Sequence, residues 1–142
     1  MNRTRVLSAM WLALVMTLLL AACGTASTGS DMAEVDVADL PDSLTVDQVV
    51  ALQDDPNVLV LDVREIEEYE AGHIPGVTHL PMGEVASRLN EIPQDQTVIV
   101  TCRTGNRSGQ VAGFLREQGY TNVHNMAGGI VEWQNAGLPV EQ

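Results

Sequence analysis

Short apolar runs of strand length alternate along this chain with segments whose apolar residues recur at helical spacing. The runs at residues 58–61 and 98–100 are unbroken, which is typical of strands buried on both faces of a sheet. This alternation predicts an α/β fold with a mainly parallel sheet of about five strands and helices on both faces. Shorter strands are predicted at residues 77–80 and 123–126, and helices at residues 46–52, 65–71, 82–90, 108–118 and 130–135.

The N-terminal segment has a different pattern, which is typical of an export signal. Two arginines in the first five residues precede an apolar run at residues 9–20, which is shorter than the ~20 residues a membrane-spanning helix needs. The run ends in Leu-Ala-Ala-Cys, which resembles the lipobox of bacterial lipoproteins, although a plain signal peptide is an alternative. We therefore expect residues 1–22 to be a lipoprotein signal peptide. A lipid on Cys23 would anchor the protein in the cell envelope, on the non-cytoplasmic side of a bacterial membrane.

Residues 23–43 are rich in Gly, Ala, Ser, Thr and Asp, contain no aromatic residue, and are predicted to form a flexible acidic tether. Residues 44–142 are then predicted to fold as one domain. The whole chain has 19 acidic and 7 basic residues, and its net charge of −12 argues against nucleic acid as a partner. We expect the protein to be a monomer.

The residues that could take part in a chemical reaction lie just after the second unbroken run, around Cys102. A short loop containing Arg103, Gly105 and Arg107 follows this cysteine, and a helix is predicted to begin at Ser108. Loop N–H groups, a helix N-terminus and two cations all favour the thiolate over the thiol, so an inert core cysteine is the weaker interpretation. With Cys23 lipidated, no second thiol would be left, and no metal site is predicted.

Three blocks of sequence together resemble single-domain rhodaneses, which are sulfurtransferases. The resemblance covers about residues 44–142 and implies a rhodanese-like three-layer fold. The blocks are the loop Cys-Arg-Thr-Gly-Asn-Arg-Ser at residues 102–108, Leu-Asp-Val-Arg-Glu at 61–65 with Gly-His-Ile-Pro-Gly at 72–76, and Ala-Gly-Gly-Ile-Val-Glu-Trp at 127–133 with Ala-Gly-Leu-Pro-Val at 136–140.

The resemblance implies that Cys102 is the catalytic residue and carries sulfur as a persulfide. Its thiolate would take the outer sulfur of a donor such as thiosulfate, and a thiophilic acceptor such as cyanide or a thiol would remove it. No metal or organic cofactor is implied. The residues implied in substrate binding, by loop N–H groups and by the charge of the two arginines, are Arg103, Thr104, Gly105, Asn106, Arg107 and Ser108.

Several alternatives remain at this point. A rhodanese-like domain can serve as a binding or regulatory module with little catalysis. A phosphatase or arsenate reductase is disfavoured, because related enzymes place five residues between cysteine and arginine, whereas four separate Cys102 from Arg107 here. Asp62 and Arg64 either orient the loop from a neighbouring strand end or form an ordinary ion pair. The glutamates at residues 65, 67, 68 and 70 are predicted to form a solvated face.

Overall fold

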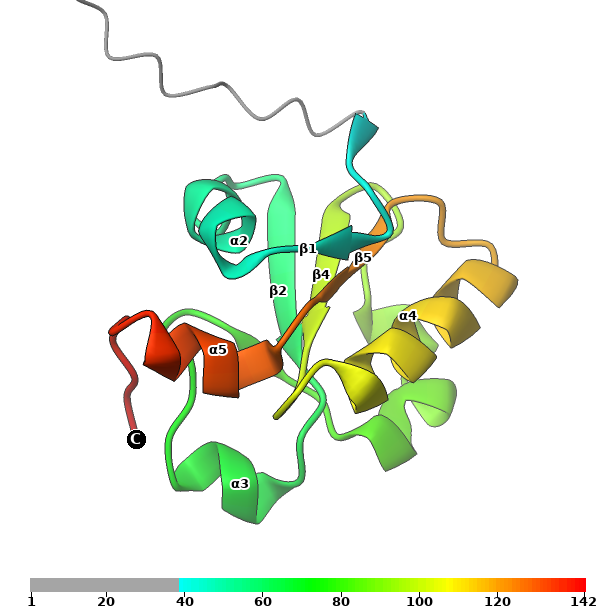
Figure 1. Cartoon of the computed structure of the whole chain (residues 1–142). Coiled ribbons are helices and arrows are strands. Elements are labelled where there is room, and N and C mark those ends of the chain that lie inside the picture. Colours follow the sequence, from blue (N-terminus) through cyan, green and yellow to red (C-terminus); the bar gives the residue numbers. More distant parts are fainter. Residues whose placement is uncertain (1–38) are drawn as a thin grey trace, which may run out of the picture. The chain divides into compact units, whose positions relative to one another are not determined.

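The computed structural model describes residues 39–142 (Figure 1). The predictions for the signal peptide, for Cys23 and for the tether up to residue 38 lie outside the described residues. The described part of the chain is built on a five-stranded sheet in which every neighbouring pair is parallel, in the order β1-β5-β4-β2-β3. The strands are β1 (Ser43–Leu44), β2 (Val58–Asp62), β3 (Thr78–His79), β4 (Thr97–Thr101) and β5 (Val123–Met126).

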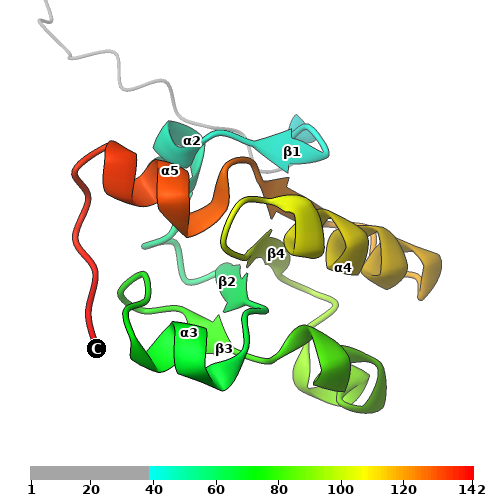
Figure 2. The same cartoon turned by 60° about the horizontal axis from the view of Figure 1, so that its bottom comes forward.

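Helices cover both faces of the sheet, which gives the three layers that the sequence predicts (Figures 1 and 2). Helices α2 and α5 pack on one face, and α4 and two 3₁₀ helices pack on the other, while α3 follows the carboxyl end of β2. The helices are α2 (Val46–Leu52), α3 (Ile66–Glu70), the 3₁₀ helices η2 (Met82–Ser87) and η3 (Leu89–Glu91), α4 (Asn106–Glu117) and α5 (Gly129–Asn135). No helix within residues 39–142 is long and apolar enough to cross a membrane.

Strand β4 lies at the centre of the sheet, and all five of its residues are buried. Val98 and Val100 belong to the apolar cluster under α4, whereas Ile99 belongs to the cluster under α2 and α5. This alternation follows from the two-residue period of a strand, and it explains why the run is apolar throughout. A strand packed on both sides provides a rigid support for the residue that follows it, Cys102.

Two predicted helices differ from the observed ones. The helix after the cysteine loop begins at Asn106 rather than Ser108, so Arg107 and Ser108 lie in its first turn. The segment predicted as one helix at residues 82–90 forms η2 and η3 instead. Pro81 precedes it, Gly83 lowers its helix propensity, and only Val85 of η2 is buried, so little favours a regular α-helix there.

The edge strand β1 was not predicted from the sequence. Leu44 is fully buried, and the main chain here pairs with β5, since Asn125 N donates to Asp42 O (2.9 Å) and Ala127 N donates to Leu44 O (2.9 Å). A two-residue strand is too short to show a period. Residues 39–43, predicted as the end of the tether, therefore precede and enter a strand of the domain.

Candidate active site

Cys102 lies at the carboxyl edge of the sheet, one residue after β4 ends at Thr101. Ligand sites in parallel sheets form at this edge. The loop from Cys102 then turns sharply into α4 through Gly105, which has φ 92°. A Cβ at this position would lie 3.1 Å from Gly128 N, so both the backbone angle and the close approach require glycine.

The Cys102 sulfur is surrounded by hydrogen-bond donors from the loop and from the first turn of α4. Gly105 N lies 3.1 Å from Sγ, and Ser108 Oγ lies 3.3 Å from it. Burial of the side chain, which is 1% exposed, acts to raise the pKa of Cys102. Hydrogen bonds from the Ser108 hydroxyl and from the N–H groups of Ser108, Thr104 and Gly105 outweigh it and hold the pKa below its usual value.

The first turn of α5 holds the cysteine loop from the other side. Ile130 N donates to Cys102 O (2.9 Å), and Val131 N donates to Arg103 O (3.1 Å). Gly129, with φ 57°, brings this turn so close that a Cβ there would overlap the Cys102 carbonyl oxygen. The glycine pair at residues 128–129 therefore fixes the loop that presents the thiol, which accounts for its place in the sequence.

The guanidinium of Arg107 is not free to bind an anion by itself, because it forms a bidentate ion pair with Glu68 of α3. The distances are 2.6 Å from Nη1 to Oε2 and 2.8 Å from Nη2 to Oε1, and the pair lowers the pKa of Glu68. The interpretation of Glu68 as part of a solvated face is therefore wrong. The two residues are 39 positions apart in the chain, a separation that no sequence period reveals.

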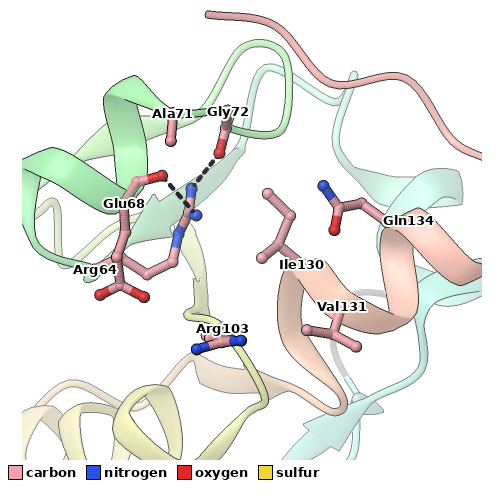
Figure 3. A pocket seen from close by; sticks show the side chains of 8 residues that line it. All are labelled: Arg64, Glu68, Ala71, Gly72, Arg103, Ile130, Val131 and Gln134. Carbon is pink, nitrogen blue, oxygen red and sulfur yellow. Dashed lines mark hydrogen bonds between the residues drawn. The ribbon is translucent and has the colours of Figure 1, made fainter.

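Arg103 is the cation that remains without a carboxylate partner. Among the arginines within residues 39–142, the other four all pair with aspartate or glutamate. Arg103 is exposed and lines a cleft of about 300 Å³ between α3 and α5, as Figure 3 shows. The other lining residues are Arg64, Glu68, Ala71, Gly72, Ile130, Val131 and Gln134.

Asp62 and Arg64 form a buried ion pair, one of the two alternatives that the sequence left open. Arg64 Nη2 lies 2.7 Å from Asp62 Oδ2, and Nε lies 2.9 Å from the same oxygen. The guanidinium also donates to the carbonyls of Glu68 (3.0 Å) and Gly72 (2.9 Å), as the dashed lines of Figure 3 show. The pair thus ties β2 to α3 and to the wall of the cleft.

The remaining loop residues contribute mainly through the backbone, and one partner of the loop escaped the sequence analysis. Thr104 and Asn106 are both exposed, and Thr104 offers its N–H group to Cys102. The missed partner is Asn125 of β5, whose Oδ1 accepts a hydrogen bond of 2.6 Å from the Ser108 hydroxyl. A single asparagine in a strand carries no signal of this role, because only the pairing of β5 with β4 brings it near the loop.

The arrangement is that of a nucleophile for small anions. A thiol held toward its thiolate form lies next to a residue whose guanidinium is free to attract negative charge. Among residues 39–142 there is no group of three or more histidine, cysteine, aspartate or glutamate side chains that could hold a metal ion.

Known proteins with similar sequences include enzymes of sulfur transfer. The chain is 43% identical over 89 residues to a protein named sulfurtransferase from Allochromatium vinosum, covering 63% of this chain and 83% of that one. It is 36% identical over 93 residues to thiosulfate sulfurtransferase GlpE of Pseudoalteromonas translucida, covering 66% and 89%. Other relatives at 40–44% identity are matched over only about half of their length.

A solved structure and a family model agree with these relatives. The crystal structure of a rhodanese-related protein from Thermoplasma volcanium superposes with a TM-score of 0.64 at 30% identity, covering 71% of this chain and 98% of that one. The family model described as rhodanese-like domain matches residues 45–136, which contain the cysteine loop, the block at residues 61–76 and the third block as far as residue 136. The chain therefore belongs to the rhodanese-like domain family.

Proposed function

We propose that the protein is a sulfurtransferase that carries a sulfane sulfur on Cys102 as a persulfide. The observation that carries the proposal is the environment of the Cys102 sulfur. Gly105 N and Ser108 Oγ lie 3.1 and 3.3 Å from Sγ, inside a loop with four residues between the cysteine and Arg107. The names of the Allochromatium and Pseudoalteromonas relatives support the same chemistry.

The reaction has two steps, and both take place at the sulfur atom of Cys102. The Cys102 thiolate attacks the outer sulfur of thiosulfate, the S–S bond of the donor breaks, and sulfite leaves with the bonding electron pair. Cys102 then carries a persulfide, whose negative charge lies on the outer sulfur. An acceptor such as cyanide or a thiolate attacks that outer sulfur, and Cys102 leaves as the thiolate again.

The surroundings of Cys102 fit a small anionic donor. The side chain is 1% exposed, so a reagent must be narrow enough to bring one terminal atom to the sulfur. Arg103, the described arginine without a carboxylate partner, supplies a positive charge in a chain whose net charge is −12. We assign the attraction of the donor's oxyanion to Arg103. Arg107 contributes less to it, because the carboxylate of Glu68 balances its charge.

The persulfide itself provides the direct test. The purified protein is incubated with thiosulfate, freed of the reagent, and weighed by intact mass spectrometry. We expect a gain of about 32 Da, one sulfur atom, which disappears on treatment with cyanide or a reducing thiol. Peptide mapping should place the added sulfur on Cys102. A chain that takes up no sulfur from thiosulfate or any other sulfane donor would instead be a rhodanese-like binding or regulatory module.

Glu68→Gln is expected to speed the reaction with an anionic donor. Glutamine keeps a hydrogen bond to Arg107 but removes the carboxylate charge, so the loop becomes more positive and the thiolate more favoured. The second-order rate constant for thiosulfate should rise by about two- to fivefold at low ionic strength. The rise should shrink at high salt, because salt screens exposed charges. It is measured from the initial rate against thiosulfate concentration.

The matched control for this variant is Glu84→Gln, which removes a carboxylate from an exposed ion pair with Arg88. That pair is no part of the loop, so the control should leave the rate constant unchanged. A fall in the rate of Glu68→Gln at all salt concentrations would show that the carboxylate positions Arg107 rather than neutralising it.

We further propose that the protein is anchored outside the cytoplasm by a lipid on Cys23. The support is the order of a basic start, an apolar run and Leu-Ala-Ala-Cys in the sequence. Expression of the full chain and of Cys23→Ala in a bacterial host, followed by membrane fractionation, tests it. The native chain should sediment with membranes and the variant should not. Sedimentation of both would assign the anchor to another feature.

A further inference from the structure

The Ser108 hydroxyl lies between two acceptors and can donate its one proton to only one of them at a time. Its Oγ is 2.6 Å from Asn125 Oδ1 and 3.3 Å from Cys102 Sγ. Ser108 is fully buried, so bulk water does not supply a substitute partner. Because a hydroxyl carries a single proton, a bond to one acceptor excludes a bond to the other.

Asn125 is held firmly in its place on β5. Its main chain pairs with Ser43 of β1 and Val100 of β4, and its N–H group donates to Asp42 O (2.9 Å). The side-chain amide Nδ2 also donates a long hydrogen bond to Ser43 Oγ (3.4 Å), and Oδ1 faces Ser108. The amide oxygen is thus a fixed acceptor, while the hydroxyl of Ser108 is free to rotate.

We propose that Asn125 is a positioning residue that competes with the Cys102 thiolate for the Ser108 hydroxyl proton. When negative charge lies on Sγ, the hydroxyl turns to the sulfur and leaves Asn125 Oδ1. When the charge leaves Sγ, the hydroxyl returns to Asn125 and remains bonded. Charge leaves Sγ when the thiolate takes a proton, and also when the outer sulfur of a persulfide carries the charge. Only the persulfide case rests on the proposed function.

This competition predicts opposite effects for the two partners. Removing the Asn125 oxygen frees the hydroxyl for sulfur and favours the thiolate, whereas removing the Ser108 hydroxyl disfavours it. Neither residue is charged, so both changes leave the net charge of the protein unaltered. The charged groups on the surrounding elements are unchanged in both variants; these are Arg103 of the loop, Arg107 of α4, Glu68 of α3, Glu132 of α5 and the Asp62–Arg64 pair at the carboxyl end of β2.

The test is the rate of Cys102 alkylation by iodoacetamide across a range of pH. It uses the full chain with Cys23→Ser, so that one thiol reacts. Asn125→Leu should lower the pH at which the alkylation rate is half-maximal, here called the midpoint, by about half a pH unit. Below the midpoint this makes alkylation about threefold faster. Ser108→Ala should raise the midpoint by about one unit. The double variant should have the same midpoint as Ser108→Ala alone. Without the Ser108 hydroxyl, Asn125→Leu has nothing to release to the sulfur.

Two controls keep the outcome sharp. Ser43→Ala removes the partner of Nδ2 without touching Oδ1 and should leave the midpoint where it is. Asn125→Ala repeats the test if the leucine variant does not fold, as judged by circular dichroism. An equal shift from Asn125→Leu with and without Ser108, or a rise in the midpoint, would overturn the proposal. Since no sulfur donor is present, a failure of the proposed sulfur transfer would leave this result standing.

Discussion

Cys102→Ser should abolish sulfur transfer while leaving the fold intact. A serine hydroxyl is not ionised near neutral pH and forms no persulfide, so the reaction loses its nucleophile and its carrier together. We expect the production of thiocyanate from thiosulfate and cyanide to fall by at least about 1,000-fold. The mass gain after incubation with thiosulfate should disappear as well. Both are measured on the purified full-length chain against the native protein.

The structure predicts that this variant folds. The serine oxygen replaces a sulfur that is already surrounded by donors, Gly105 N and Ser108 Oγ, and the two side chains differ little in volume. The thermal midpoint should therefore shift by only a few degrees, a change of about 1 kcal/mol in the free energy of unfolding. Cys23→Ser is the matched control, since it removes the other cysteine of the chain and should keep full transfer activity. Residual sulfur uptake by Cys102→Ser would assign the sulfur to a different atom.

The main architecture was predictable from the sequence because burial on both faces leaves an unbroken apolar run. The runs at residues 58–61 and 98–100 became β2 and β4, the central pair of the parallel sheet. Asp62 and Cys102 come at the carboxyl ends of these two strands. Because parallel strands run in the same direction, both residues had to lie at the carboxyl edge of the sheet. Local chemistry can be read from the sequence as well: Thr45 and Gln48 have the Thr-x-x-Gln spacing of a capping box, and they form one at the start of α2.

What the sequence did not reveal was how charges and amides are shared between distant segments. Arg107 and Arg103 look equivalent in the loop, yet Glu68 of α3 neutralises one and leaves the other free. Asn125 lies 17 residues from Ser108, and only the order of β4 and β5 brings the two together. Contacts of this kind depend on how helices and strands pack against one another. The period of apolar residues in the sequence indicates only which face of a helix or strand is buried.

The buried pair of Asp62 and Arg64 is a further example, and its removal is expected to have the largest effect on stability. Asp62→Ala leaves the guanidinium of Arg64, a residue that is 4% exposed, without its counter-charge. Breaking a buried pair from one side costs about 3–5 kcal/mol, a large part of the 5–15 kcal/mol typical of a domain. For a domain of this size, we expect the thermal midpoint to fall by about 12 °C or more. Calorimetry or circular dichroism on heating measures it.

The physical reason can be separated from the simple loss of a side chain by removing both charges. Asp62→Leu with Arg64→Met replaces the pair by apolar groups of similar volume and should recover much of the loss, because no unpaired charge remains in the interior. Glu84→Ala, which breaks the exposed pair with Arg88, is the matched control and should leave the midpoint nearly unchanged. Equal losses for Asp62→Ala and for the double variant would contradict this account, because the double variant leaves no unpaired charge and removes only the hydrogen bonds of Arg64, including those to Glu68 O and Gly72 O. Under the expected result, the same pair that fixes the wall of the cleft beside Arg103 also sets the stability of the domain.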